Sequence, residues 1–142
     1  MITAPHHLAA EAGRDVLREG GTAVEAMVTA AAVIAVVYPH MNAIGGDGFW
    51  LIGEAGQRPV GIDAGGPAAE LATRDWYHAQ GATTIPARGP LAALTVPGTI
   101  GGWAAALAQP NARSNPIPLA RLLAPAVALA RGVCPPPRGR KP

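Results

Sequence analysis

An almost unbroken apolar run from Ala26 to Tyr38 sets the strongest limit on the fold, because Thr29 is the only polar residue in it. Its 13 residues fall short of the about 20 that a helix needs to cross a bilayer, so the run is typical of a buried core helix. Thr22 and Glu25 form the T-x-x-E pattern of a capping box before it, and Pro39 follows its end. We therefore expect a helix that needs partners on most of its sides.

Further elements are predicted on both sides of this run. Apolar positions three and four residues apart predict a helix over residues 6–17, which Gly20 and Gly21 are suited to end. The other predicted elements are a short strand at Met1–Ala4, strands at Phe49–Gly53 and Pro59–Asp63 joined by a hairpin loop, helices at Thr73–His78 and Thr99–Gln109, a strand at Leu91–Val96, and a helix from Pro118 that Pro125 kinks or divides. Because helices precede two strands that are close enough to pair antiparallel, we expect an α+β layered sandwich instead of an alternating parallel sheet.

The composition excludes some classes of function. The formal charge is only +2, and Arg138, Arg140 and Lys141 lie at the C-terminal end, so no basic face for nucleic acid is predicted. Cys134 is the single cysteine, so no intrachain disulfide can form and a metal site would need other ligands. The N-terminal residues lack the features of a signal peptide, and no apolar segment is long enough to span a membrane. We expect a soluble protein without membrane or nucleic-acid partners, with the cytoplasm slightly favoured.

A glycine-rich stretch, PHMNAIGGDGFWLI from Pro39 to Ile52, admits three interpretations. A phosphate-binding loop is disfavoured, because the stretch lacks the lysine and hydroxyl of a P-loop and because a helix precedes it and a strand follows. A metal site on Asp47 is disfavoured, because one carboxylate without a clear companion binds a cation weakly. We favour a backbone crossing, in which the glycines allow positive φ and a close backbone approach between a buried helix and a sheet.

Few other residues are candidates for chemistry. Asp63 is the best placed, at the end of a strand and before Gly65 and Gly66, where it is either a functional residue or a turn former. The adjacent His6 and His7 are more typical of a solvent-facing helix start than of a metal site. The remaining nucleophile candidates have no visible activating base: Ser114, Cys134 and the threonines. These residues predict a scaffold without a complete catalytic site, with no catalytic residue, no metal ligand and no cofactor.

Several motifs occur in the order and spacing of the γ-glutamyltranspeptidase family, which the chain resembles. Residues 20–26 read GGTAVEA where the family has G-G-N-A-V-D-A. Residues 39–49 resemble P-H-x-x-G-(I/L)-G-G-G-G-F, with Ala43 and Asp47 in place of glycines. The segments ATRDWY, LTVPGTIGGW and PLARLLAPAVALARG follow in the family's order. The resemblance covers nearly all of residues 1–132.

This resemblance implies a fold and a mechanism. The chain would be an incomplete part of the four-layer αββα sandwich of an N-terminal-nucleophile hydrolase, which is made as a precursor that cuts itself into two subunits. In the family, the N-terminal threonine of the small subunit attacks the γ-glutamyl amide with its own amine as base. Water or an amino acid then cleaves the acyl-enzyme, and a glycine pair stabilises the oxyanion. Both groups belong to the later part of the precursor, so the resemblance implies two partners: the remainder of the precursor or small subunit, and a small γ-glutamyl or other amide substrate.

The resemblance also implies an arginine in the motif I-D-x-R-E-x-A-P, which grips the α-carboxylate of the glutamyl group. In an ungapped alignment, Gly65 stands at the arginine position and Gly66 at the glutamate position, two and three residues after Asp63. We therefore expect the substrate-binding position at Asp63, Gly65 and Gly66, without the guanidinium that pairs with a carboxylate. An acylase-type specificity for another amide is the alternative to γ-glutamyl transfer or hydrolysis.

The end of the chain departs from the family pattern. Residues 133–142 form a Pro- and Arg-rich tail that we expect to be disordered, and its composition is what GC-rich DNA encodes in a shifted frame. We expect residues 1–132 to be the N-terminal segment of a γ-glutamyltransferase-like domain, truncated or frameshifted and inactive alone. A non-enzymatic scaffold remnant is the alternative. An incomplete sandwich leaves apolar faces uncovered, which predicts self-association.

Overall fold

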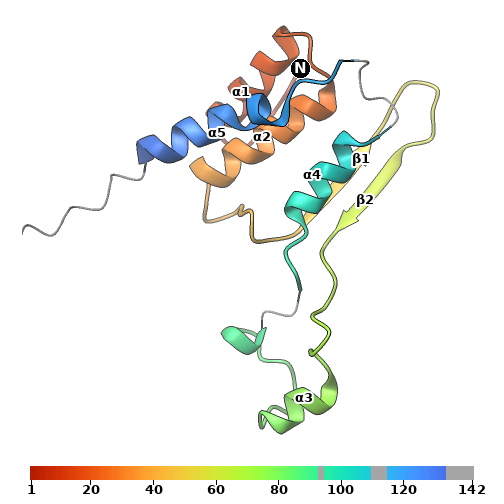
Figure 1. Ribbon diagram of the computed structural model, residues 1–142, viewed down its shortest axis with the longest axis vertical. Helices are drawn as coiled ribbons and strands as arrows, with labels where there is room; N and C mark the ends of the chain where they lie inside the picture. The colour runs from red at the N-terminus through yellow and green to blue at the C-terminus, as the bar shows by residue number, and fades with distance from the viewer. Residues whose placement is uncertain (93–94, 110–114, 134–142) are drawn as a thin grey trace, which may run out of the picture. The chain divides into compact units, whose positions relative to one another are not determined.

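The computed structural model describes residues 1–92, 95–109 and 115–133, which contain both helices and a β-hairpin (Figure 1). The elements are α1 (His7–Arg18), α2 (Ala23–Val37), β1 (Gly48–Ile52), β2 (Val60–Ala64), α3 (Arg74–Ala79), the 3₁₀ turn η1 (Pro90–Ala92), α4 (Thr99–Leu107) and α5 (Leu119–Val133). The chain divides into two compact units. We call residues 1–44 with the chain from Trp103 onward the helical unit, and residues 45–102 the hairpin unit.

Local signals fix both ends of α1. The imidazole of His6 caps its start by accepting a hydrogen bond from the main-chain N–H of Leu8 (3.3 Å). At its end, Gly20 adopts a φ of 83°, and the N–H of Gly21 donates to the carbonyl of Val16 (2.8 Å). This is the left-handed glycine ending that the sequence predicted.

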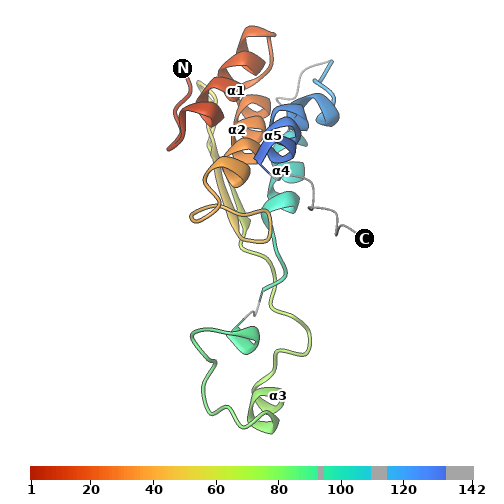
Figure 2. The ribbon, with the colours of Figure 1, turned by 90° about the vertical axis from the view of Figure 1, so that its left-hand side faces the viewer.

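The apolar run forms the buried helix α2, as predicted. Its capping box is present, since Glu25 N–H donates to Thr22 Oγ1 (3.1 Å) and Thr22 N–H donates to Glu25 Oε2 (2.6 Å). Val28 and Val33 are fully buried. Helix α2 lies beside both α1 and α5 in the two ribbon views (Figures 1 and 2). It therefore has the neighbours on several sides that its sequence requires.

Helix α5 completes the core of the helical unit. Leu122 is 1% exposed and packs in one cluster with Val16 and Ala26. Pro125 lies inside the helix and does not divide it. The proline removes one main-chain hydrogen bond, and the burial of Leu122 and Ala126 on either side of it offsets that loss.

In the hairpin unit, β1 and β2 pair antiparallel as predicted, with Phe49 opposite Asp63 and Trp50 opposite Ile62. Side chains alternate between two faces along a strand. One face bears Phe49 and Leu51, which are 73% and 81% exposed. On the other face, Trp50 lies close to Gly102 of α4.

Two predicted strands are wrong. Residues 1–4 form no strand, because Ile2 packs against the core cluster of the helical unit instead of pairing with another strand. In the segment 91–96, Pro90–Ala92 form a 3₁₀ turn and Thr95 makes a single bridge with Ala68. The strand fails because its described part has only this one residue pair to continue a ladder. Residues 93–94 lie outside the described residues.

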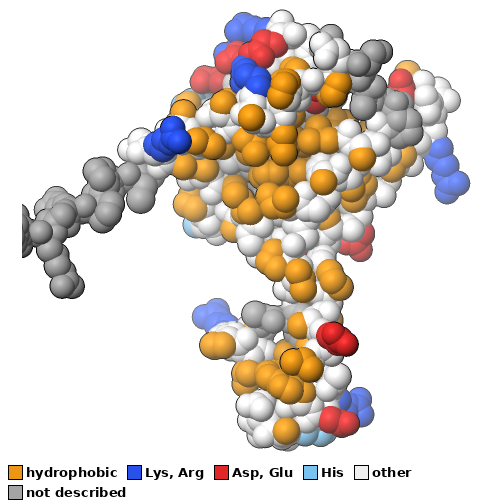
Figure 3. Space-filling view, viewed as in Figure 1, with side chains coloured by type: hydrophobic (Ala, Val, Ile, Leu, Met, Phe, Trp, Pro, Cys, Tyr) orange, Lys and Arg blue, Asp and Glu red, His pale blue; other side chains and the backbone are white. Residues whose placement is uncertain are grey.

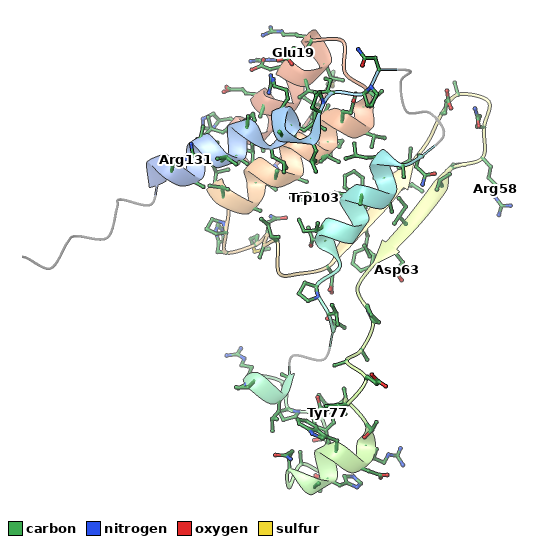
Figure 4. The ribbon with its side chains drawn as sticks, viewed as in Figure 1. Glu19, Arg58, Asp63, Tyr77, Trp103 and Arg131 are labelled. Atoms are coloured by element: carbon green, nitrogen blue, oxygen red, sulfur yellow. The ribbon has the colours of Figure 1, made fainter. Side chains whose placement is uncertain are left out.

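The other predicted helices are confirmed. Helix α3 is capped by Thr73, whose hydroxyl accepts from the N–H of Trp76 (3.2 Å). Tyr77, labelled on this helix in Figure 4, is 6% exposed. Hydrophobic side chains reach the surface in both units (Figure 3). Within the described ranges, no helix combines the length and apolar character that crossing a membrane requires. The disordered tail was predicted at residues 133–142, and this is wrong for Val133, which is the last residue of α5. Residues 134–142 lie outside the described part of the chain.

Candidate substrate-binding loop

The predicted site residues lie where β2 ends and the chain turns (Figure 4). Asp63 is exposed, and its Oδ1 accepts a hydrogen bond from the N–H of Gly65 (2.9 Å). A carboxylate that bonds the main chain two residues later builds a local turn. The structure therefore brings Asp63 and Gly65 together, and it gives Asp63 the role of a turn former. Their role in binding a substrate stays a prediction.

Gly65 has room for a side chain. Its φ is not positive, and a Cβ at this position would lie 3.2 Å from Asp63 Oδ1 and 3.7 Å from Cζ of Phe49. The carboxylate of Asp63 would have to move by a few tenths of an ångström. The main chain therefore does not forbid an arginine at this position, and its absence is a property of the sequence.

Gly66 has no such room. Its φ is +72°, a conformation that side chains disfavour, and a Cβ would lie 1.7 Å from the carbonyl oxygen of Val96. The glutamate that the family motif has at this position is thus incompatible with the loop as it is folded.

A second glycine makes the reciprocal contact. A Cβ on Gly98 would lie 2.0 Å from the carbonyl oxygen of Ala64 and 2.9 Å from the nitrogen of Gly66. The N–H of Val96 donates to the carbonyl of Pro67 (2.8 Å). We call this contact between residues 64–67 and 95–98 the glycine crossing. It presses two main-chain segments together, since neither glycine presents a side chain at the contact.

The glycine run of residues 45–48 differs from its predicted role. None of its glycines has a positive φ, and a Cβ on Gly45 would meet nothing within 4 Å. The prediction of positive φ is therefore wrong for these glycines. A Cβ on Gly48 would lie in ordinary contact, 3.6 Å from Cα of Thr99, so the tight main-chain contacts are those of Gly66 and Gly98. The run acts instead as an acceptor. The carbonyl of Gly46 receives the N–H groups of Gly98 (3.1 Å) and Thr99 (3.0 Å), together with the Thr99 hydroxyl (2.7 Å).

Thr99 was not singled out from the sequence. It is 8% exposed and stands at the first position of α4, and its hydroxyl oxygen also lies 3.1 Å from the carbonyl of Asp47. Its partners are 52 and 53 residues away in the chain, so no local pattern reveals the contact. The only sequence signal is the Pro-Gly-Thr turn before an apolar helix.

The remaining candidates form no metal site in the described part of the chain, where no group of three or more His, Cys, Asp or Glu side chains is close enough to bind an ion. The rings of His6 and His7 stack at 4.6 Å, and His6 serves as the helix cap already described. Asp47 is exposed. Ser114 and Cys134 lie outside the described residues.

A pocket of about 400 Å³ lies beside α3 and was also missed. Arg74 and His78 line it from one face of the helix, and Thr83 and Thr84 line it from the following loop. Tyr77 also lines it and donates its hydroxyl to the carbonyl of Leu91 (2.8 Å). The spacing of four residues between the arginine and the histidine is the signal that predicts a shared helix face.

Comparison with known proteins places these features in context. Residues 9–135 match the sequence profile described as Gamma-glutamyltranspeptidase. The chain is 55% identical over 131 residues to the Oxamate amidohydrolase proenzyme of Klebsiella pneumoniae, which covers 92% of this chain and 24% of that protein. It is 43% identical to the Glutathione hydrolase-like YwrD proenzyme of Bacillus subtilis, over 77% of this chain and 21% of that protein.

Solved structures of related enzymes are also similar to this chain. The γ-glutamyltranspeptidase of Helicobacter pylori superposes with a TM-score of 0.77 at 35% identity, covering 92% of this chain and 37% of that one. A cephalosporin acylase from Bacillus halodurans superposes with a TM-score of 0.77 at 35% identity, covering 88% of this chain and 22% of that one. The chain spans about a quarter of the length of the curated relatives it matches.

Proposed function

The chain belongs to the γ-glutamyltranspeptidase family, and we propose that it supplies the N-terminal part of a family amidohydrolase that does not select γ-glutamyl substrates. Its α+β elements are part of the N-terminal-nucleophile hydrolase fold of that family. The proposed substrate is a small amide of the oxamate kind. This choice is supported by the 55% identity to a relative named as an oxamate amidohydrolase.

The observation that carries the proposal is the loop of Asp63, Gly65 and Gly66. A glutamyl α-carboxylate needs a cationic, preferably bidentate partner, and this loop contains none. Asp63, whose Oδ1 accepts a hydrogen bond from the N–H of Gly65, supplies no positive charge that could replace the arginine. Gly66 cannot bear a side chain that compensates. Glutamyl substrates therefore lose their main anchor at this position.

The chemistry requires a partner. As the family resemblance implies, an N-terminal threonine from the remainder of the precursor would attack the amide carbonyl, ammonia would leave, and water would hydrolyse the resulting ester. Residues 1–132 would supply the helical and hairpin scaffold, and we expect the 142-residue chain alone to be inactive. The exposed Phe49 and Leu51 support a partner, because large apolar side chains gathered on one strand face are typical of a contact surface.

Complementation tests the proposal. The chain is co-expressed with the Klebsiella relative from which the matching N-terminal segment has been removed, and ammonia release from oxamate is compared with the hydrolysis of a γ-glutamyl anilide. We expect oxamate hydrolysis only when both parts are present, with little γ-glutamyl activity. Turnover by the 142-residue chain alone, or faster γ-glutamyl than oxamate hydrolysis by the pair, would overturn the proposal. A folded pair without activity on either substrate would favour the scaffold remnant.

The substitution Gly65→Arg tests the missing anchor directly. Restored charge-assisted hydrogen bonds should lower the KM for the γ-glutamyl anilide in the complemented enzyme by about tenfold or more. Gly61→Arg is the matched control, because Gly61 is an exposed glycine of β2 with nothing within 4 Å of an added Cβ and is outside the family motif position. An unchanged KM in Gly65→Arg would show that the glutamyl carboxylate is held elsewhere.

A further inference from the structure

We propose that Thr99 and Gly98 are positioning residues for the substrate-binding loop, and that they determine how well substrate binds without touching it. This inference rests on the proposed function of the loop at Asp63–Gly66. It concerns a different set of residues, which lie 32 or more positions later in the chain than Gly66.

The glycine crossing couples the loop to the segment before α4. With a Cβ position of Gly66 only 1.7 Å from Val96 O, and that of Gly98 only 2.0 Å from Ala64 O, the two segments touch through main-chain atoms on both sides. Main-chain atoms cannot change rotamer to relieve a contact, so a displacement of residues 95–98 displaces residues 64–66 as well. The position of the loop is therefore set by the position of Gly98.

Gly98 is itself anchored by hydrogen bonds to Gly46. Its N–H and that of Thr99 both donate to the carbonyl of Gly46, and the Thr99 hydroxyl donates to the same oxygen at 2.7 Å. The hydroxyl is the only side-chain group among these three donors, and it belongs to a buried residue. An acceptor that loses one of its donors holds the chain less firmly. Thr99 thus fixes Gly98, which in turn fixes the loop.

These contacts affect binding more than chemistry. A substrate held by main-chain groups of the loop requires those groups to be placed within about 0.5 Å. The loop has no long side chain at Gly65 or Gly66 that adjusts to the substrate. Its binding strength therefore depends on how tightly residues 95–99 restrain it. The reacting threonine comes from the partner, so the chemical step depends on this restraint much less.

The experiment replaces the hydroxyl while keeping the side-chain shape. In the complemented enzyme, Thr99→Val should raise the KM for oxamate by about tenfold, with kcat changed by less than about twofold. Thr99→Ser keeps the donor and should restore the KM. Thr3→Val is the matched control, since Thr3 is an exposed residue outside the glycine crossing, and it should have no effect.

Hydrogen exchange of the 142-residue chain gives a readout that needs no activity. Thr99→Val should speed amide exchange at Val96, Gly98 and Gly65, and leave the amides of α1 unchanged. An inactive unsubstituted pair would refute the proposed function while exchange still decided the positioning role. A loss of kcat without a change in KM, an unchanged exchange rate in the loop, or a failure of Thr99→Ser to restore the KM would each overturn the inference.

Discussion

The helical unit and the hairpin unit are stabilised by different kinds of contact. In the helical unit, apolar side chains from three helices meet in one cluster that contains Val16, Ala26 and Leu122. In the hairpin unit, main-chain groups meet at the glycine crossing, and the large apolar side chains of Phe49 and Leu51 remain exposed. The stability of the helical unit therefore depends on side-chain volume, and that of the hairpin unit depends on the close contact between main-chain segments. Substitutions that change one of these should affect one unit and not the other.

The largest effect is expected from Gly66→Ala. The new methyl group would clash with the carbonyl of Val96 and would strain a φ of +72°. We expect the free energy of unfolding of the hairpin unit to fall by about 3 kcal/mol or more, with no change in the helical unit. In limited proteolysis, the variant should be cut within residues 45–102 while α1 and α2 stay protected.

Gly56→Ala separates strain from clash. Gly56 has a φ of +78° with nothing within 4 Å of an added Cβ, so this control should cost only about 1 kcal/mol. Equal losses of stability in Gly66→Ala and Gly56→Ala would mean that the contact with Val96 adds nothing to the cost of the positive φ.

The next largest effect is expected in the helical unit from Leu122→Ala. Removing a side chain that is 1% exposed leaves a cavity, which should cost about 3 kcal/mol in urea unfolding followed by circular dichroism. The same change at Leu119, which is 52% exposed on the same helix, should cost less than about 0.5 kcal/mol. A similar loss at both positions would contradict a core formed by α5.

A smaller effect is expected from Glu25→Gln. Glu25 is 4% exposed, and its carboxylate accepts hydrogen bonds from the N–H groups of Thr22 (2.6 Å) and Ile117 (2.7 Å). An amide offers one acceptor oxygen and turns its NH₂ group toward one of these donors, so we expect a loss of about 2 kcal/mol by the same urea assay. Glu11→Gln, an exposed change on α1, should be neutral. Equal losses of stability in Glu25→Gln and Glu11→Gln would show that the Glu25 carboxylate does not stabilise the contact between α2 and the segment before α5.

The smallest effect on stability, with a clear effect on association, is expected from Leu51→Thr. Leu51 is 81% exposed on the uncovered face of the hairpin, and threonine retains the strand preference. We expect a change below about 0.5 kcal/mol in unfolding and a marked fall in self-association by analytical ultracentrifugation. A variant that associates as strongly as the unchanged chain would exclude this face as the contact.

Local signals predicted most of the fold. The capping box of Thr22 and Glu25 and the ending at Gly20 involve residues within a few positions of one another, so the sequence contains both partners of each contact. The hairpin of β1 and β2 was predicted for the same reason. The wrong strand at Leu91–Val96 shows the limit, because apolar residues form a strand only when a partner is present, and Thr95 has one bridging partner among the described residues.

The candidate site was predictable in its residues but not in its contacts. Alignment to a family motif singled out Asp63, Gly65 and Gly66, and it could not show that Gly65 tolerates a side chain while Gly66 does not. That difference arises from Val96, which is 30 residues further along the chain. The glycine run was interpreted from its residue type, whereas its contribution is a carbonyl oxygen, which every residue has. Main-chain contacts of this kind have no signature in side-chain sequence.

The hydrogen bond from Ile117 to Glu25 has a consequence for synthesis on the ribosome, since the two residues are 92 positions apart. Helices α1 and α2 are complete long before Ile117 is made. At a synthesis rate of about 5 to 20 residues per second, about 5 to 20 s pass between the synthesis of Glu25 and that of Ile117. During that interval the nascent helix pair has the acceptor but not its distant donor. We therefore expect the helical unit to reach its final stability only late in translation, when residue 117 leaves the exit tunnel.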